Sequence, residues 1–329
     1  MTNKKSFYVG FDTSNYTTSM AACDESGNII ANVKMPLLVK EGNRGLRQSD
    51  AVFLHVKNFT EMYEKFGKAI DGFEKLIAVG ASDKPRSCEG SYMPCFLVGY
   101  TSSLAYAQNA SVPAYTFSHQ DGHVMAALYS AANPEGDRAP LDMDNIMSAP
   151  FAAFHVSGGT TELLLVDPRG EDFKIEKLGG TEDLNAGQAI DRMGVKMGLK
   201  FPCGPEMESL ANENSENLPP RKICVKGYTC CLSGLENLAE SLYVKTNDKS
   251  LTSAFVFEYV AETIGRLTDN LRDEYPGIPV IYAGGVMSNK IIKSKLSARE
   301  NVYFADPQFS ADNAAGIALL CRRRHLQEK

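Results

Sequence analysis

One short pattern occurs twice in this 329-residue chain, beginning at residues 11 and 154. Residues 11–19 read F-D-T-S-N-Y-T-T-S and residues 154–162 read F-H-V-S-G-G-T-T-E, so a phenylalanine, a serine and two threonines keep their offsets. In each copy an apolar run enters a Ser/Thr/Gly turn and a second apolar run leaves it, as in a β-hairpin. The repeat predicts two related lobes with a duplicated core, although chance similarity between polar turns is an alternative.

A pair of such turns is suited to an anionic ligand. Backbone N–H groups and hydroxyls can point at phosphate oxygens, and glycine allows close approach. We therefore expect the turns at 12–18 and 156–161 to face one another across a cleft. For residues 157–161 (SGGTT), an ordinary hairpin turn is the alternative.

Strands and helices alternate along the rest of the chain, which predicts the α/β class. Periodicity and turn signals predict strands at 7–11, 19–23, 29–37, 76–80, 112–118, 151–156, 161–167, 278–285 and 302–306. They predict helices at 51–70, 96–109, 186–198, 233–245 and 252–273, another from His119, one after residue 285, and a last one capped by Ser310. Residues 134–150 are expected to form an ordered loop. We place one lobe at 1–118 plus 306–329 and the other at 119–305.

Composition and charge limit the partners and the cellular environment expected for this chain. The chain has 34 Lys+Arg against 40 Asp+Glu, a net charge of −6, so an RNA partner would need a local basic patch or a helper protein. None of the eight cysteines forms a C-x-x-C, and no secretory signal is visible, so we expect reduced thiols in a cytoplasmic protein. No apolar run approaches the ~18 residues of a membrane span.

Two histidines are spaced as metal ligands. His119 and His123 lie four residues apart, so on a helix both imidazoles can reach one ion. Asp312 is the candidate third ligand, and this set leaves open positions for a substrate oxygen. Gln120 stands where a zinc protease has its glutamate, which argues against a peptidase. Surface or capping histidines are the alternative.

Four further residues are candidates for nucleotide contacts. Gly187 and Asp191 are expected on one helix face, where glycine would admit a ribose and the carboxylate would accept from its hydroxyls. Gly204 lies in the rigid turn F-P-C-G-P. Asn289 follows a strand that ends in A-G-G, a common place for a nucleotide in α/β folds. The structural alternatives are a close helix contact for Gly187, a solvated carboxylate for Asp191, a plain loop for Gly204 and a local hydrogen bond for Asn289.

Taken together, these signals resemble the tRNA threonylcarbamoyl-adenosine transferase family, formerly described as glycoproteases or sialoglycoprotein endopeptidases. Six motifs, in the family's order, cover nearly the whole chain. They are SHQDGH (118–123), HVSGGTTEL (155–163), GGTEDLNAGQAIDRMGVKMGLKFPCGP (179–205), CLSGLEN (231–237), YAGGVMSNKIIKSKL (282–296) and FADPQFSADNAAGIA (304–318). The resemblance implies the two-lobed fold of actin, hexokinase and the heat-shock ATPases, which agrees with the internal repeat.

The resemblance also implies an activity, cofactors and site residues. An acyltransferase of this family passes a threonylcarbamoyl group from threonylcarbamoyl-AMP to N6 of an adenosine in tRNA, with one divalent metal ion (iron or zinc) and with partner proteins of a threonylcarbamoylation complex. By this likeness His119, His123 and Asp312 hold the metal, and Asp12 and Ser14 in the first turn are catalytic. The implied contacts to the adenylate are His155, Val156, Ser157, Gly158, Gly159, Asp191, Gly204 and Asn289.

The chain departs from the family pattern in its first turn. Tyr16 and Thr17 replace two acidic residues there, Thr160 replaces the usual His or Asn, and Gln188 replaces Glu. These changes surround the expected entrance for substrate and RNA. The alternative function is therefore a divergent nucleotide-binding paralogue, or a carbamoyl transferase with an acceptor other than tRNA.

Overall fold

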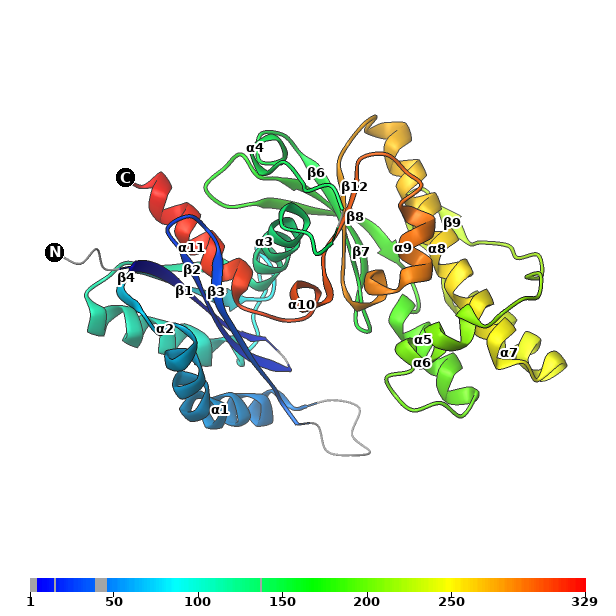
Figure 1. The fold of residues 1–329 in the computed structure, drawn as a ribbon, viewed down its shortest axis with the longest axis horizontal. Coiled ribbons are helices and arrows are strands. Elements are labelled where there is room, and N and C mark those ends of the chain that lie inside the picture. Colours follow the sequence, from blue (N-terminus) through cyan, green and yellow to red (C-terminus); the bar gives the residue numbers. More distant parts are fainter. Residues whose placement is uncertain (1–4, 15, 39–45, 137) are drawn as a thin grey trace. The chain divides into compact units, whose positions relative to one another are not determined.

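The computed structural model describes residues 5–14, 16–38, 46–136 and 138–329, which pack as two units (Figure 1). Unit 1 comprises Met1–Tyr129, Arg169–Phe173 and Ala311–Lys329, and unit 2 comprises Ser130–Pro168 and Lys174–Ser310. The lobe boundaries expected from the sequence stay a prediction. No helix within the described ranges is long and apolar enough to cross a membrane. All eight cysteines are free thiols.

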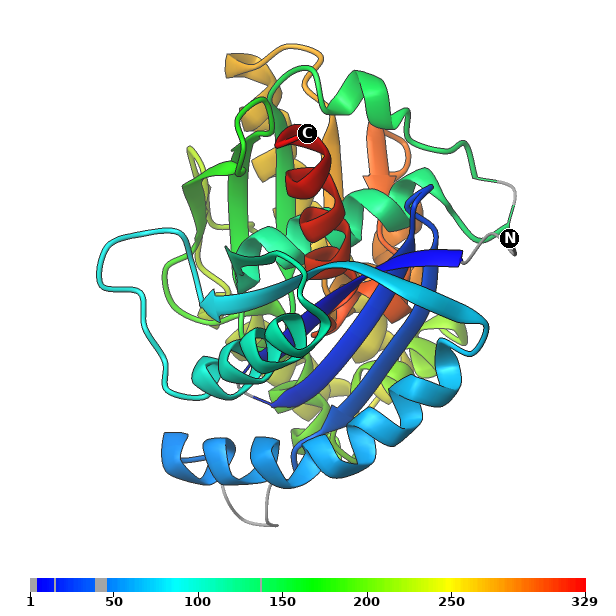
Figure 2. The ribbon, with the colours of Figure 1, turned by 90° about the vertical axis from the view of Figure 1, so that its left-hand side faces the viewer.

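Unit 1 is built on a five-stranded sheet (Figure 2). Its strands, in spatial order, are β3 (Ile29–Pro36), β2 (Thr17–Asp24), β1 (Lys5–Ser14), β4 (Phe73–Lys84) and β5 (Ala114–Ser118). The first three are antiparallel, whereas β4 and β5 run parallel to β1. Helices α1 (Gln48–Ala69) and α2 (Phe96–Ala110) pack on the sheet, as does α11 (Ala315–Gln327).

Side-chain alternation assigns these helices to opposite faces of the unit 1 sheet. On β1, Phe7, Val9 and Phe11 enter the apolar core beneath α1, together with Phe59 and Met62. The intervening residues face α11, because Tyr8 packs on His325 and Gly10 lies against Ala318. Since successive strand residues point to opposite faces, Asp12 also belongs to the α11 face.

Unit 2 contains a seven-stranded sheet. Its strands, in spatial order, are β12 (Val302–Phe304), β11 (Val280–Ala283), β6 (Phe151–Val156), β7 (Thr161–Asp167), β8 (Lys174–Thr181), β10 (Thr229–Cys230) and β9 (Val225–Lys226). Its helices are α4 (Met143–Ile146), α5 (Ala186–Lys196), α6 (Gly204–Asn212), α7 (Ser233–Thr246), α8 (Lys249–Glu274), α9 (Lys290–Leu296) and α10 (Pro307–Ser310). Helix α3 (His119–Ala132) spans the division between the units.

The two sheets share one topology. In unit 2 the order β8-β7-β6-β11-β12 repeats the order β3-β2-β1-β4-β5 of unit 1. In both, three antiparallel strands are followed by two strands parallel to the first. The sequence repeat coincides with this duplication, because it covers the β1–β2 and β6–β7 hairpins. The α/β class and the duplicated core are therefore confirmed, and chance does not explain the repeat.

Several local predictions need correction. Ser310 does not cap the last helix: it ends α10, its Oγ donates to the carbonyl oxygens of Ala305 and Asp306, and α11 begins only at Ala315. Most of the predicted turn at 12–18 is strand, because β1 and β2 pair as far as Ser14 and Thr17. Strand β8 and helix α6 were not predicted. The helix predicted after residue 285 begins at Lys290, because a short 3-10 turn (Gly285–Ser288) comes first.

Candidate active site

The close contact between α3 and α11 positions the predicted metal ligands. A Cβ on Gly316 would lie 1.8 Å from the carbonyl oxygen of Gly122, so only glycine permits this approach. Helix α3 begins at His119, and Asp312 lies three residues before α11. The crossing therefore brings the first turn of α3 beside Asp312.

The three predicted ligands converge within unit 1. Nε2 of His123 lies 3.3 Å from Oδ1 of Asp312, and Nε2 of His119 lies 3.6 Å from the same oxygen. The two Nε2 atoms are 2.9 Å apart. One ligand atom from each residue can be chosen so that all lie within 4.8 Å of one another. Two imidazoles and a carboxylate at this spacing are a donor set that suits a divalent transition metal.

Asp12 lies behind the cluster, on the far side of the His119 ring. Its Oδ2 is 2.7 Å from Nδ1 of His119, and the residue is only 1 % exposed. A carboxylate at Nδ1 fixes the ring so that Nε2 faces the other two ligands, as in many metal sites. Burial alone would lower the pKa of His119, but the carboxylates of Asp12 and Asp312 raise it to about 10. The structure thus places Asp12 beside a predicted metal ligand, His119.

Strand pairing shows which other residues share this face. Asp12 is opposite Ser19 on β2, and Ser19 is opposite Lys34 on β3, so the three side chains form one row. Burial lowers the pKa of Lys34, while the Asp312 carboxylate opposes that shift. The sequence analysis missed this lysine, because no local pattern marks it. Only the register of three strands reveals a cation beside the cluster.

Ser14 and Thr17 lie on the same face, at the end of the hairpin. They pair with each other across β1 and β2. The backbone N–H of Ser14 donates to Oδ1 of Asp12 at 2.9 Å. Its buried Oγ has no hydrogen-bond partner among the described residues. Ser14 therefore helps to hold Asp12 through its backbone and leaves a hydroxyl unused.

Asp121, the acidic residue of the SHQDGH motif, has a structural role. Its Oδ2 accepts from the backbone N–H and the Oγ of Ser118, and its own N–H donates to that Oγ. This reciprocal pair resembles a capping box and satisfies the free N–H groups at the start of α3. Asp121 thus fixes the helix that carries both histidines and is not among the ligand atoms.

Unit 2 contains a pocket of about 330 Å³, within the range of small-molecule sites. Four predicted substrate residues line it, Gly158, Asp191, Gly204 and Asn289. The other four do not: Val156 is fully buried, His155 is part-buried on β6, and Ser157 and Gly159 shape the adjoining turn. Lining residues that sequence reasoning missed include Ile190, Glu208, Phe257 and Val286.

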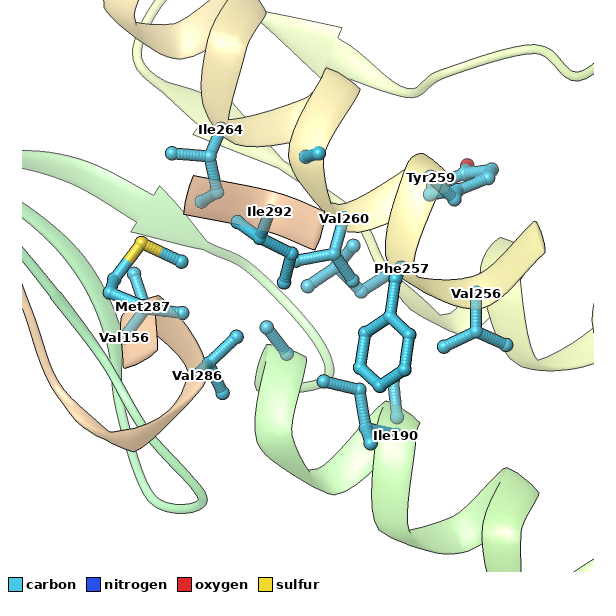
Figure 3. Close-up of a cluster of buried hydrophobic side chains, with 14 of the residues drawn as sticks. Val156, Ile190, Val256, Phe257, Tyr259, Val260, Ile264, Val286, Met287 and Ile292 are labelled. Carbon is cyan, nitrogen blue, oxygen red and sulfur yellow. The ribbon is translucent and has the colours of Figure 1, made fainter. Parts of the chain in front are cut away.

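Some of the side chains that line this pocket belong to the buried hydrophobic cluster drawn in Figure 3. The ring of Phe257 on α8 points toward Ile190 on α5. Elsewhere in the pocket, Nδ2 of Asn289 donates to Glu208 at 2.8 Å, while its Oδ1 accepts from the N–H of Ile292 and caps α9. Glu208 was missed because α6 was not expected. Asn289 thus makes the local hydrogen bond that was the alternative to a nucleotide contact, and it also lines the pocket.

Gly187 lines this pocket beside Asp191 and also makes the close helix contact that was its alternative role. A Cβ there would lie 2.7 Å from the Cα and N of Gly158 and from the carbonyl oxygen of Ser157. The N–H of Gly187 donates to that oxygen at 3.2 Å. The missing side chain therefore lets α5 pack directly on the Ser-Gly-Gly turn.

Comparisons with known proteins agree with this arrangement. A family model described as tRNA N6-adenosine threonylcarbamoyltransferase matches residues 49–319. The chain belongs to this family. A relative with that name from Bacillus licheniformis is 29 % identical and aligns over 97 % of this chain and 92 % of its own. One from Thermus thermophilus is 34 % identical over 70 % of this chain and 66 % of its own.

Solved structures support the fold. HypF of T. kodakarensis is similar with a TM-score of 0.59 and 12 % identity, over 99 % of this chain and 48 % of its own. The (R)-2-hydroxyglutaryl-CoA dehydratase component A of Acidaminococcus fermentans has a TM-score of 0.54 and 15 % identity. The match covers 97 % of this chain and 99 % of that protein's chain. A Streptomyces griseus ROK family glucokinase has a TM-score of 0.51 and 13 % identity. The match covers 96 % of this chain and 99 % of that protein's chain. The predicted actin/hexokinase-like fold is confirmed.

Two departures from the threonylcarbamoyltransferase pattern have local explanations. Gln188 accepts from the N–H of Asn185 at 3.3 Å, so it provides the capping contact that Glu would also make. The hydroxyl of Thr160 lies 2.7 Å from that of Ser157 and closes the turn. Tyr16, in contrast, is 41 % exposed at the tip of the first hairpin, and the structure gives this departure no local explanation.

Asp183 in this family's third motif caps α7 from a distance, so Asp183→Ala should destabilise the protein. Its carboxylate accepts from the N–H groups of Leu232 and Ser233 at 2.8 and 3.1 Å. Burial opposes the shift, but these hydrogen bonds and others lower the pKa of Asp183 to about 2. Loss of a cap typically costs about 1 kcal/mol of unfolding free energy.

Urea unfolding at several pH values tests this prediction. A lowered folded-state pKa contributes stability above the unfolded-state value and loses it as pH falls toward about 2. The difference between Asp183→Ala and the unaltered protein should therefore be full at pH 7 and shrink below pH 4. The exposed Asp273→Ala on α8 is the control and should stay near the unaltered protein. Equal stability of both variants at pH 7 would contradict the capping role.

Proposed function

We propose that this protein transfers a threonylcarbamoyl group from threonylcarbamoyl-AMP to N6 of an adenosine in tRNA. The convergence of His119, His123 and Asp312 carries the proposal, in a chain whose relatives are named for this transfer. In the reaction the N6 amine bonds to the carbamoyl carbon, the bond from that carbon to the phosphate oxygen breaks, and AMP and one proton leave.

The metal proposed here is one divalent iron or zinc ion on His119, His123 and Asp312. The residues present fit such an ion, because both imidazoles offer Nε2 toward one carboxylate and Asp12 fixes one ring from behind. Bound there, the ion would supply Lewis-acid polarisation of a substrate oxygen and a template for its orientation. Asp12 is thus proposed as a positioning residue.

The remaining roles belong to this chain's own groups. The unit 2 pocket holds the adenylate, with Asp191 available to accept from ribose hydroxyls and with the Gly158 backbone of the Ser-Gly-Gly turn near the phosphate. In unit 1, Lys34 adds a positive charge on the cluster's face, which favours an anionic substrate. The hydroxyl of Ser14 has no intramolecular partner in the described chain and is proposed to contact the acyl group.

A transfer assay tests the proposed function. The purified protein, loaded with Fe²⁺ or Zn²⁺, is incubated with threonylcarbamoyl-AMP and unmodified tRNA, and the nucleosides are analysed by mass spectrometry. Threonylcarbamoyl-adenosine is expected. Adenylate binding without transfer would contradict the tRNA reaction and favour another acceptor. Because the net charge is −6, we also propose cytoplasmic partner proteins that help to capture the RNA.

The altered first turn predicts a slow enzyme. Thr17 lies on the same sheet face as Asp12, so Tyr16→Asp with Thr17→Glu would restore acids close to the cluster. A carboxylate there can orient the amine or accept its proton, whereas a phenol of pKa about 10 stays protonated near neutral pH. The double variant should raise the transfer rate at least tenfold, within the usual range for acid–base groups.

The neutral double variant Tyr16→Asn with Thr17→Gln is the matched control and should not gain activity. Adenylate affinity should be similar in all three proteins, because the pocket residues are unchanged. If the unaltered protein already transfers at about 1 per second, a usual enzymatic rate, then the family's acids are dispensable.

A further inference from the structure

A second pocket in unit 2, of about 320 Å³, lies apart from the adenylate pocket and shares none of its lining residues. It is formed by β12, the edge strand of the sheet, together with α9 and the segment that follows α3. Three cationic side chains line it, Arg138, Lys293 and Arg299. The proposed transfer reaction uses none of them.

Two of these cations are neutralised by neighbouring carboxylates. Arg299 makes a bidentate pair with Asp269, with both distances 2.8 Å. Arg138 pairs with the buried Asp306 and also donates to the carbonyl oxygen of Phe304. These pairs fix both guanidinium groups at the pocket wall.

Lys293 has no such partner. No carboxylate within residues 5–14, 16–38, 46–136 and 138–329 forms an ion pair with it, and its Nζ lies 5.3 Å from the centre of the Phe304 ring. Burial and the nearby Arg138 lower the pKa of Lys293, while Asp306 opposes the shift. A partly desolvated ammonium group without an ion-pair partner is an unfavourable arrangement that a bound anion would relieve.

We propose that this pocket binds a phosphate group of a small molecule, as inorganic phosphate or a phosphate monoester, with Lys293 as its central cation. Ser297 adds a hydroxyl at the wall, and Arg138 is held close by. The remaining walls include Ala131, Val302 and Phe304, which suit a compact ligand with an apolar part. An RNA backbone instead requires an extended basic surface, and here two of three cations are already paired.

In the test, inorganic phosphate is titrated into the metal-free full chain. Calorimetry measures the affinity, and thermal unfolding measures the change in melting temperature. Lys293→Gln removes the charge, Lys293→Arg keeps it, and Lys295→Gln on the same helix is the control, because Lys295 pairs with Glu258. Phosphate should raise the melting temperature of the unaltered protein, of Lys293→Arg and of Lys295→Gln. Lys293→Gln should bind at least tenfold more weakly, as expected for a lost charge-assisted hydrogen bond.

Lys293→Gln should also be at least as stable as the unaltered protein without phosphate, since it removes an uncompensated charge. Potassium chloride at equal ionic strength separates specific binding from screening. Equal phosphate affinity of Lys293→Gln and the unaltered protein would overturn the proposal. The proposal would also be overturned if the unaltered protein bound no phosphate and Lys293→Gln lost affinity for tRNA, because Lys293 would then contact RNA. Adenylate transfer is measured separately, so its failure leaves this result intact.

Discussion

His119→Ala should lose its stoichiometric divalent metal and, with it, transfer activity. The substitution removes a predicted ligand that contacts both other members of the cluster through Nε2 and contacts Asp12 through Nδ1. It also leaves the buried Asp12 carboxylate without its ring partner. Because loss of an outer-shell partner alone typically costs 10–100-fold in metal affinity, loss of a ligand should cost more than ~100-fold.

Metal content after dialysis, measured by mass spectrometry, checks this result, and calorimetry with Zn²⁺ gives the affinity. His325→Ala is the matched control: His325 lies on α11, contacts Tyr8 and Tyr115, and takes no part in the cluster. Asp12→Asn keeps the shape of the positioning side chain, and its metal affinity should lie between those of His119→Ala and His325→Ala. Stoichiometric metal in His119→Ala, with thermal unfolding unchanged, would place the ion elsewhere.

The sequence predicted that the two histidines lie side by side because their signal is local. Two histidines four residues apart on a helix need only the helical period to become neighbours. The partners of that cluster have no local signal. Asp12 lies 107 residues from His119, and Lys34 reaches the same face only through two strand pairings. Positions of this kind follow from topology, which the repeat indicated but did not resolve to single residues.

The errors at element ends have physical causes. Ser310 has the residue type of an N-cap, but its hydroxyl donates to the carbonyl oxygen of Asp306, just before α10, and the N-cap position of α11 is taken by Ala314. Helix α6 was taken for a turn because F-P-C-G-P contains two prolines and a glycine. Proline is favourable in the first turn of a helix, where its missing N–H costs nothing, and Pro205 occupies that place. Missing α6 also hid Glu208 and its contact with Asn289.

In unit 2, Gly187→Ala should have a large effect on the adenylate pocket. The new methyl group would lie 2.7 Å from two backbone atoms of Gly158 and from one of Ser157, and backbone cannot yield as a flexible side chain can. The start of α5 also holds this turn through Asn185, whose Nδ2 donates to the carbonyl oxygen of Gly159 at 3.0 Å. Moving α5 away from the turn would therefore deform the pocket lined by Gly158 and Asp191.

AMP affinity of Gly187→Ala, measured by calorimetry, should fall more than tenfold, and the unfolding free energy of the chain should fall by about 1–3 kcal/mol, as is usual for overpacking. Gly234→Ala on α7 is the control: the nearest atom to its Cβ is 3.9 Å away, and alanine favours a helix over glycine. Metal content should be unchanged in both variants, because the ligand cluster belongs to unit 1. Unaltered AMP affinity in Gly187→Ala would show that the Ser-Gly-Gly turn does not shape the adenylate site, whereas loss of AMP and metal together would indicate general unfolding.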